Sequence, residues 1–451
     1  MFQTFKNAFK IPDLRKKILF TLFIILLYRV GSAIPVPFVN GNMLKFFTEY
    51  SSAAGSQGGI FSLLNTMSGG AMSQATLFAL GVQPYINSSI IIQLLTIAIP
   101  ALERLSKEGE EGKKKLNSIT RVVTVILALV MSIGYYMLLK NEAFGLPVLN
   151  NTHWFAGVVI VACYCAGASL VMWLAEKINE SGIGNGISII LFANIIARLP
   201  HAAASIWTTA MSMFNKGGVI NVVWGIVFIV AIIVVMVALV GFVVFITESE
   251  RRIPVQYAKR VVGRKMYGGQ SSTLPIKLNM TGVMPIIFAS TICSLPSTIL
   301  MFISEPANDG IGKSIYNFFN TVFNPDTSVV YMILYAVLII AFAYFYVAIS
   351  FNPVEVANNI KKNGGSIVGI RPGKPTADFI SKVLSKITLI GAIFLGFIAI
   401  FPMILNLINS DMFGSIAFGG SSLLIVVGVA LETVREIEAQ MTMRHYKGFL
   451  D

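Results

Sequence analysis

Ten apolar stretches, most of them near the length that a membrane-crossing helix needs, dominate this sequence. A helix spans the hydrocarbon core of a bilayer with about 20 mostly apolar residues. The chain is 55% hydrophobic and 12% charged, whereas a soluble domain is about 25% charged. The stretches cover roughly 18–37, 75–100, 119–139, 154–175, 183–199, 219–247, 278–303, 328–351, 383–407 and 415–434. They leave no room for a separate soluble domain, so we expect an all-α polytopic membrane protein with ten transmembrane helices.

The basic residues lie unevenly along these stretches. With ten spans, one side of the membrane holds the N-terminus and the segments near 101–121, 176–182, 248–277, 352–386 and 435–451, which carry 28 of the 34 Lys and Arg residues. Loops rich in Lys and Arg stay in the cytoplasm. We therefore expect both termini to be cytoplasmic. The first apolar run is long and is followed by no small-residue cleavage site, so it reads as an uncleaved span.

Few residues suggest chemistry or a cofactor. Cys163, Cys165 and Cys293 fall within expected spans, where small core residues are the ordinary interpretation. The segment "ANDGIGKS", 307–314, nearly matches a phosphate-binding loop, but Ala307 replaces its first glycine and the charge pattern puts it outside the cell. We predict no enzyme, no cofactor and no metal.

The expected spans carry uncharged polarity rather than charge. Arg29 is the exception, and its ordinary role would be to bond backbone carbonyls freed at the following Gly/Pro break. Transporters coupled to ions or solutes usually bury acids or bases near the midplane. The second and fifth spans instead each combine polar residues with an aliphatic pair at i, i+4 on one helical face: Gln83, Ile86, Asn87 and Ile90, and Ile187, Leu191 and Asn194. Such a stripe fits ordinary helix packing or a water-lined path closed by an apolar constriction.

Five segments spread over the chain resemble the signature segments of the SecY family, the pore subunits of bacterial protein-conducting translocons. They are "FALGVQPYINSSIIIQLL", "SGIGNGISIILFANI", "RRIPVQYAKRVVG", "STLPIKLNMTGVMPIIFAS" and "IVGIRPGKPTA". The resemblance implies ten helices in two pseudo-symmetric halves, 1–200 with spans one to five and 201–451 with spans six to ten, around a central pore. It also implies transport of unfolded polypeptide across the membrane and lateral release of hydrophobic segments into lipid.

Matching the motifs residue by residue assigns a pore and a gate. The resemblance implies a pore ring of Ile86, Ile90, Ile187, Leu191, Ile287 and Ile425. Leu191 departs from the isoleucine common there but keeps its size and apolarity. The implied lateral gate lies between the second and seventh spans, near Asn87, Ile91, Pro285 and Ser290.

The segment "FSLLNTMSGGAMSQATLFALG", 61–81, is too polar to span a bilayer and too apolar for a solvated loop. From its residues alone, a fixed re-entrant packing element and a movable plug are about equally good interpretations. The resemblance favours a short plug helix at about 57–73 that closes the pore from outside. Its apolar contacts and flexibility would come from Phe61, Leu63, Leu64, Met67, Gly69 and Gly70.

The long loops at 248–277 and 352–386 are basic and rich in glycine. Most of their charge serves topology and lipid attraction. Protruding basic hairpins also suit ribosomal RNA and a cytoplasmic motor, and the resemblance implies the ribosome, the SecA ATPase and the small subunits SecE and SecG as partners. We expect the contacts to come from Arg251, Arg252, Lys259, Arg260, Arg264 and Arg371.

Two other classes of function remain as alternatives. A secondary transporter for a small solute predicts buried charges and specific polar contacts at the midplane. A structural membrane scaffold predicts neither an aligned polar stripe nor large basic hairpins. Copurification with a small single-span subunit would separate both from a translocation channel.

Overall fold

The structure is a computed structural model that describes residues 2–39, 65, 67–140, 149, 153–214, 219–257, 260–262, 265–267, 271–300, 311–323, 328–408 and 419–447. Helices make up most of it. They are α1 (Phe2–Lys10), α2 (Pro12–Gly31), α5 (Gln83–Ala98), α6 (Pro100–Lys107), α7 (Glu110–Lys140), α8 (Trp154–Ser181), α9 (Gly186–Phe214), α10 (Val219–Glu248), α11 (Met284–Leu300), α12 (Ile311–Val322), α13 (Val329–Ser350), α14 (Pro353–Lys362), α15 (Lys374–Ile408) and α17 (Gly419–Lys447).

Each of the ten apolar stretches coincides with a different one of these helices. In the described part of the chain, five helices are long and apolar enough to cross a membrane, and α5 with α6 passes the same test as one bent pair. The pair bends by 102° at its break, where Pro100 begins α6. Two shorter apolar helices, Gly186–Pro200 and Met284–Pro296, belong to α9 and α11. The chain is therefore a mainly helical multi-pass membrane protein, and ten spans stay a prediction.

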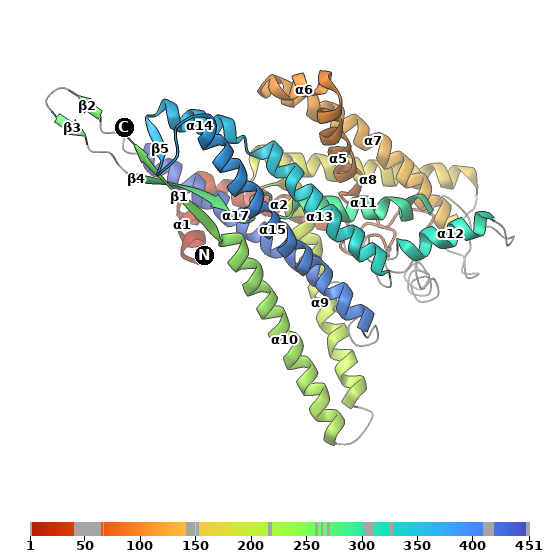
Figure 1. The fold of residues 1–451 in the computed structure, drawn as a ribbon. Coiled ribbons are helices and arrows are strands. Elements are labelled where there is room, and N and C mark those ends of the chain that lie inside the picture. The colour runs from red at the N-terminus through yellow and green to blue at the C-terminus, as the bar shows by residue number, and fades with distance from the viewer. Residues whose placement is uncertain are drawn as a thin grey trace.

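One boundary between the expected spans differs from the structure. The sequence predicts a connection across 200–218, but α9 continues through Pro200 to Phe214. The stretch that follows Pro200 is rich in alanine, the strongest helix former, and a proline removes only one hydrogen bond of the helix. The outer parts of α9 and α10 form a hairpin that extends away from the other helices (Figure 1). The expected boundary between residues 200 and 201 thus falls inside a helix.

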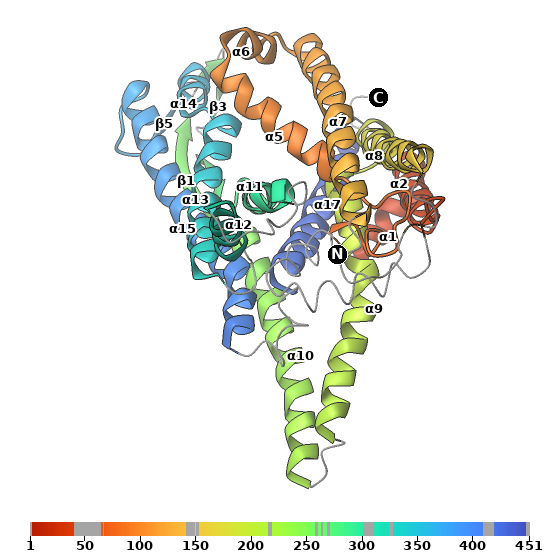
Figure 2. The ribbon, with the colours of Figure 1, turned by 90° about the vertical axis from the view of Figure 1, so that its right-hand side faces the viewer.

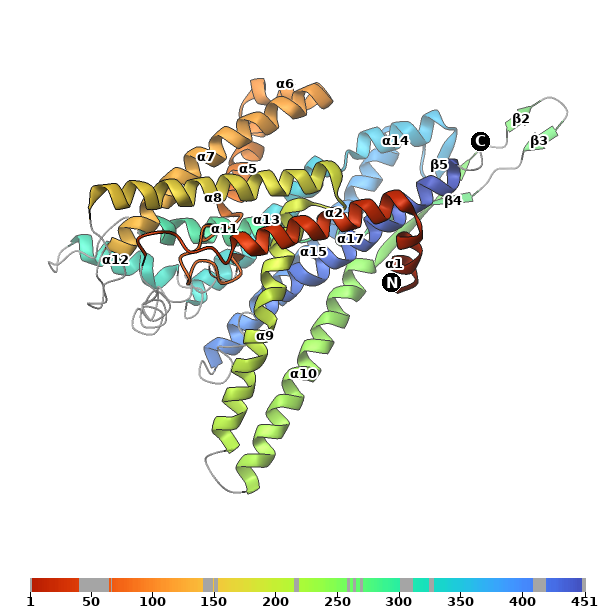
Figure 3. The same ribbon diagram turned by 180° about the vertical axis from the view of Figure 1, so that it is seen from behind.

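The strands all lie outside the apolar helices. Strand β1 (Glu250–Tyr257) pairs antiparallel with β4 (Ser271–Lys277) and with β5 (Gly365–Ile367) in a sheet of order β4-β1-β5. A second ladder joins β2 (Arg260–Val262) to β3 (Lys265–Tyr267). Ile253, Val255, Ile276 and Ile367 anchor the first sheet in an apolar cluster with α15. The strands, α1 and the end of α17 lie at the same end of the molecule (Figure 3).

Helices surround the centre of the molecule when it is viewed from the end (Figure 2). Helices α5, α7, α8 and α2 lie on one side, and α13 and α15 lie on the other. The largest buried cluster draws residues from α2, α5, α8, α9, α11, α13, α15 and α17. The core therefore sits where helices from both ends of the sequence meet, and this is where the candidate site lies.

Candidate functional site

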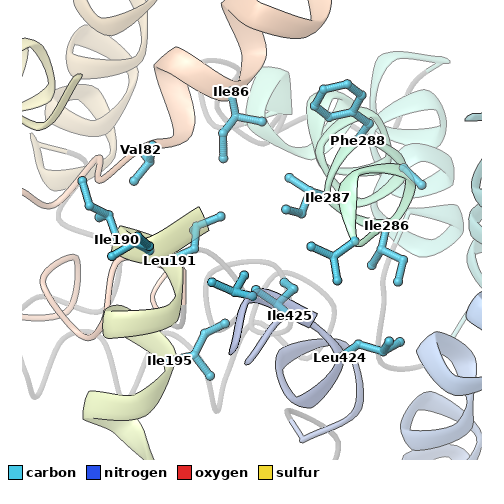
Figure 4. Packing of buried hydrophobic residues seen from close by; sticks show 14 of the residues in the cluster. Val82, Ile86, Ile190, Leu191, Ile195, Ile286, Ile287, Phe288, Leu424 and Ile425 are labelled. Atoms are coloured by element: carbon cyan, nitrogen blue, oxygen red, sulfur yellow. The ribbon is translucent and has the colours of Figure 1, made fainter. Parts of the chain in front are cut away.

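A ring of aliphatic side chains lies where α5, α9, α11 and α17 converge. Five of the six predicted ring residues are buried in one cluster, and the sixth, Ile187, is half-buried against it. Ile86, Leu191, Ile287 and Ile425 point toward a common centre from four different helices (Figure 4). The structure thus brings the six predicted residues together, although they are separated by up to 339 positions in the sequence.

Local sequence signals explain how two of these helices present their ring residues. Helix α5 begins at Gln83 with a proline in its first turn, which suits a helix start, and it carries Ile86 and Ile90 one turn apart. At the start of α9, the side-chain oxygen of Asn185 accepts a hydrogen bond from the amide of Ile187 at 3.1 Å. A Cβ at Gly186 would lie 2.0 Å from the carbonyl oxygen of Ala175, so only glycine lets α9 pack this closely on α8.

The cluster extends beyond the predicted ring. Other members, which the sequence analysis missed, are Val82, Ile190, Ile195, Ile286 and Leu424 (Figure 4). The sequence did contain a signal for them, because each lies one or four positions from a predicted ring residue. A helix face that packs in a core carries a wide apolar stripe, which includes such neighbours. Aliphatic side chains of this kind offer no hydrogen bonds to water or ions.

The segment after α2 packs against the same cluster through Met67. Its later part is fixed to neighbouring helices: the hydroxyl of Tyr135 on α7 donates to the carbonyl oxygen of Met72 at 2.6 Å, and the amide of Leu77 donates to the carbonyl oxygen of Ile34 at 2.9 Å. Residues 65 and 67 have helical backbone, and turns follow. The predicted plug residues Phe61, Leu63 and Leu64 lie outside the described residues.

Near Met67, the segment after α2 contacts polar side chains of α2 and α9. The amide nitrogen of Asn194 donates to the carbonyl oxygen of Met67 at 2.8 Å and to the hydroxyl of Tyr28 at 2.9 Å. The guanidinium of Arg29 donates to the carbonyl oxygen of Ala193. The sequence predicted that Arg29 bonds carbonyls freed at the Gly/Pro break after α2, whereas the structure pairs it with a carbonyl of α9. Arg29 is not the only charge in these stretches, because Arg198 lies on α9.

The predicted gate residues lie where α5 faces its neighbours, and they do not all face the same helix. Helix α5 touches α11, on which Pro285 is buried and the hydroxyl of Ser290 donates to the carbonyl of its own turn. The amide of Asn87 instead lies 3.9 Å from the sulfur of Met131 on α7, and Ile91 is exposed. No partner for the Oδ1 of Asn87 lies among the described residues.

A side-chain bridge that the sequence did not reveal spans the same region. The hydroxyl of Tyr346 on α13 donates to the Oε1 of Gln93 on α5 at 2.6 Å, and the ring of Tyr346 lies 5.0 Å from that of Phe288 on α11. Tyr346 and Gln93 also line a cavity of about 620 Å³ between α5, α6, α7 and α13. At its rim, the ammonium of Lys107 binds the carboxylate of Glu103 and lowers the pKa of Glu103.

The predicted partner-binding arginines lie on the strands and the turn beyond them. Arg251 and Arg252 are exposed on β1, where the carboxylate of Glu250 lies 2.7 Å from the Nε of Arg252. Arg371 is exposed in a turn whose backbone the hydroxyl of Thr376 holds by a 2.9 Å bond to the Arg371 carbonyl. The backbone of Arg260 belongs to β2, whereas Lys259 and Arg264 lie outside the described residues.

Comparisons with known proteins agree with this architecture. A family model described as SecY matches residues 76–434. The chain is 44% identical to the protein translocase subunits SecY of Mycobacterium bovis and Streptomyces coelicolor, in each case over the full length of both chains.

Solved structures share the fold at lower sequence identity. One, described as the structure of a protein conducting channel, has a TM-score of 0.61 and 17% identity over 95% of this chain and 92% of the other. Sec61 in the canine ribosome-channel complex from the endoplasmic reticulum has a TM-score of 0.58 and 16% identity, with the same coverage. Because the family model matches most of the sequence and full-length relatives share 44% identity with it, this chain belongs to the SecY family of protein translocase subunits.

Proposed function

We propose that this chain forms a protein-conducting channel that passes unfolded polypeptides across the membrane and releases hydrophobic segments sideways into lipid. The observation that carries the proposal is the aliphatic ring contributed by α5, α9, α11 and α17, with Met67 packed against it. An apolar ring makes no specific bond to its passenger, which suits polypeptides of varied sequence. The same ring opposes the passage of water and ions when no polypeptide is present.

Three parts divide the work of this channel. Ile86, Ile90, Ile187, Leu191, Ile287 and Ile425 form the seal, and the segment of Met67, Gly69 and Gly70 acts as its plug. The gate opens between α5 and α11, near Asn87, Ile91, Pro285 and Ser290. Opening would separate a half made of residues 1–200 from a half made of residues 201–451. Helix α5 and the start of α9, with Ile187 and Leu191, belong to the first half, and α11 and α17 belong to the second.

The channel performs no catalysis of its own, so a partner must supply the energy. We propose that the SecA ATPase and the ribosome dock on the basic strands and turns, through Arg251, Arg252 and Arg371, together with Lys259, Arg260 and Arg264. A ribosome accompanies the related canine Sec61 structure and the yeast Ssh1 complex. SecE and SecG complete the assembly as small membrane subunits.

The chain resides in the bacterial cytoplasmic membrane with both termini in the cytoplasm. Two observations support this orientation. The loops on the side of the termini hold most of the Lys and Arg residues. Helix α1, the end of α17 and the basic strands lie at one end of the molecule (Figure 3).

Reconstitution tests the proposal directly. Proteoliposomes that contain this chain with its SecE and SecG subunits should import an unfolded secretory precursor when SecA and ATP are added, measured as protection of the precursor from external protease. Proteoliposomes without the chain are the control. Protection that is equal in both, or accumulation of a small solute in place of the precursor, would contradict a protein-conducting channel.

A further inference from the structure

A buried polar cluster joins the plug segment to two helices. Asn194 on α9 is fully buried, and its one amide nitrogen bonds both the carbonyl oxygen of Met67 and the hydroxyl of Tyr28 on α2. Arg29, the next residue of α2, bonds the carbonyl oxygen of Ala193. Three segments far apart in the sequence therefore meet at one side chain.

Gly69 fits closely against this cluster. Its backbone is in the left-handed region, at φ +69°, which favours glycine. A Cβ at this position would lie 2.9 Å from the Oδ1 of Asn194 and 3.0 Å from the Nη1 of Arg29. The backbone of the segment thus rests directly on the polar side chains, without a side chain of its own between them.

The bond to Met67 differs from the other attachments of this segment. Residues 72–77 are held by Tyr135 on α7 and by backbone bonds to Ile34 and Val36 beside α2. Residues 67–69 lie on the other side of Gly70, whose φ is +90°. Glycine at this position lets the backbone change direction. Two hydrogen bonds to side-chain oxygens cross it, from the amide of Met72 to the hydroxyl of Ser68 at 3.2 Å and from the amide of Ser73 to the Oδ1 of Asn65 at 3.0 Å. Departure of the inner residues from the ring would break these two bonds and leave the bonds to Tyr135, Ile34 and Val36 in place.

All of these attachments come from α2, α7, α9 and the chain that follows α2. Separation of α5 from α11 at the gate breaks none of the hydrogen bonds described for Met67, Met72 and Leu77. A buried amide that loses its partner is costly, which gives the bond to Met67 its stabilising effect. Release of the segment is therefore a step distinct from opening of the gate.

We propose that Asn194, oriented by Tyr28 and Arg29, is a latch that holds Met67–Gly69 on the ring and sets the ion leak of the resting channel. The proposal deepens the proposed function and rests on it. Asn194 is a positioning residue that acts through its bond to Met67.

The test compares resting ion leak of proteoliposomes that contain the assembled complex and no precursor. Asn194→Leu keeps the branching of the side chain and its number of heavy atoms, and it removes the donors. We expect it to raise the leak about two- to tenfold, as the loss of one buried hydrogen bond predicts. Tyr28→Phe should raise the leak less, because the bond to Met67 remains. Ser169→Ala is the matched control, since that hydroxyl donates to the carbonyl oxygen of Cys165 within its own helix α8 at 2.9 Å, and its leak should equal that of the unmodified protein.

A second readout reports the segment itself. In a background without Cys163, Cys165 and Cys293, a Met67→Cys variant should react faster with a membrane-impermeant maleimide added outside when Asn194→Leu is also present. A role in fold stability alone would lower the yield of complex without changing this rate per assembled complex.

Unchanged leak and unchanged maleimide rate in assembled Asn194→Leu overturn the latch. If Asn194→Leu does not assemble, the Tyr28→Phe variant decides the question, and a leak equal to that of Ser169→Ala overturns the proposal. Ile90→Asn in the ring, measured in parallel, separates this failure from a failure of the proposed function. If Ile90→Asn raises the leak and Asn194→Leu does not, only the latch is rejected. If neither variant raises the leak, the ring is rejected as the seal.

Discussion

The hydroxyl of Tyr346 and the side-chain oxygen of Gln93 lie 2.6 Å apart and join α13 to α5, although 253 positions separate them in the sequence. This bond closes the region beside the candidate gate, because α5 would have to move away from α11 and α13 to expose the ring to lipid. Phe288 of α11 packs on the same tyrosine ring. The three helices are thus held by one aromatic side chain and one amide.

Removing this hydroxyl should favour the open gate. Tyr346→Phe keeps the ring contact with Phe288 and deletes the bond to Gln93. Side-chain hydrogen bonds between membrane helices contribute about 0.6 kcal/mol on average and up to about 1.7, so the open population should rise about three- to twentyfold. Export of a precursor with a weakened signal sequence measures the change. Tyr344→Phe is the control, because that hydroxyl bonds Ser385 on α15 at 3.0 Å, and equal export from both variants would contradict the role of the bridge.

A polar side chain in the ring should let water enter. Ile90→Asn or Ile425→Asn adds two donors and an acceptor to an aliphatic neck and weakens its contact with the plug segment. We expect higher resting ion leak and export of precursors with defective signals. Isoleucine-to-leucine changes at the same positions keep size and apolarity and should do almost nothing. Reduced export of every precursor alike, at matched protein levels, would show that these residues only pack the core.

Deleting residues 61–70 should unseal the channel without disturbing its assembly. The deletion removes the contacts of Met67 and leaves Met72 bound to Tyr135, so the fixed part of the segment stays in place. Single-channel recording should detect more frequent openings in the absence of precursor. Conductance like that of the unmodified channel would mean that the segment is a fixed packing element.

Close packing at Gly167 predicts a loss of stability. A Cβ at this position of α8 would lie 2.0 Å from the carbonyl oxygen of Leu77. Gly167→Ala therefore forces α8 and the segment apart, and overpacking of this kind costs about 1–3 kcal/mol. Thermal unfolding of the detergent-solubilised complex should shift to lower temperature. Gly241→Ala on α10 meets no atom within 4 Å and should leave the transition unchanged, so equal shifts would contradict the packing argument.

Charge reversal at Arg371 should impair docking of cytoplasmic partners. The side chain is exposed in a turn fixed by Thr376, and its planar guanidinium offers five donors in a geometry that lysine does not copy. Arg371→Glu should lower SecA-driven import at limiting SecA and leave assembly normal. Lys382→Glu, an exposed charge reversal further along α15, is the control. If Arg371→Glu imports the precursor as well as the unmodified protein does, the turn has a role in membrane topology alone.

Local patterns were enough to predict much of the molecule. The lengths of the apolar stretches identified the helices, because a membrane-crossing helix must be apolar over about 20 residues. The six residues that matched motifs assigned to a pore ring lie close together, five of them in one buried cluster and Ile187 against it. The basic, glycine-rich composition predicted a protruding loop at 248–277, although not that it forms strands or that one of them pairs with β5.

The sequence by itself determined which segments are helices, which loops are basic and which faces are aliphatic, because hydrophobicity and charge act over a few neighbouring residues. Only the tertiary structure decided that Asn194 reaches Met67, that Tyr346 reaches Gln93, and that Asn87 faces Met131 rather than α11. It also decided that α9 continues past Pro200 to Phe214. Such contacts join residues tens to hundreds of positions apart, and they depend on how whole helices pack, which the period and composition of a single helix do not encode.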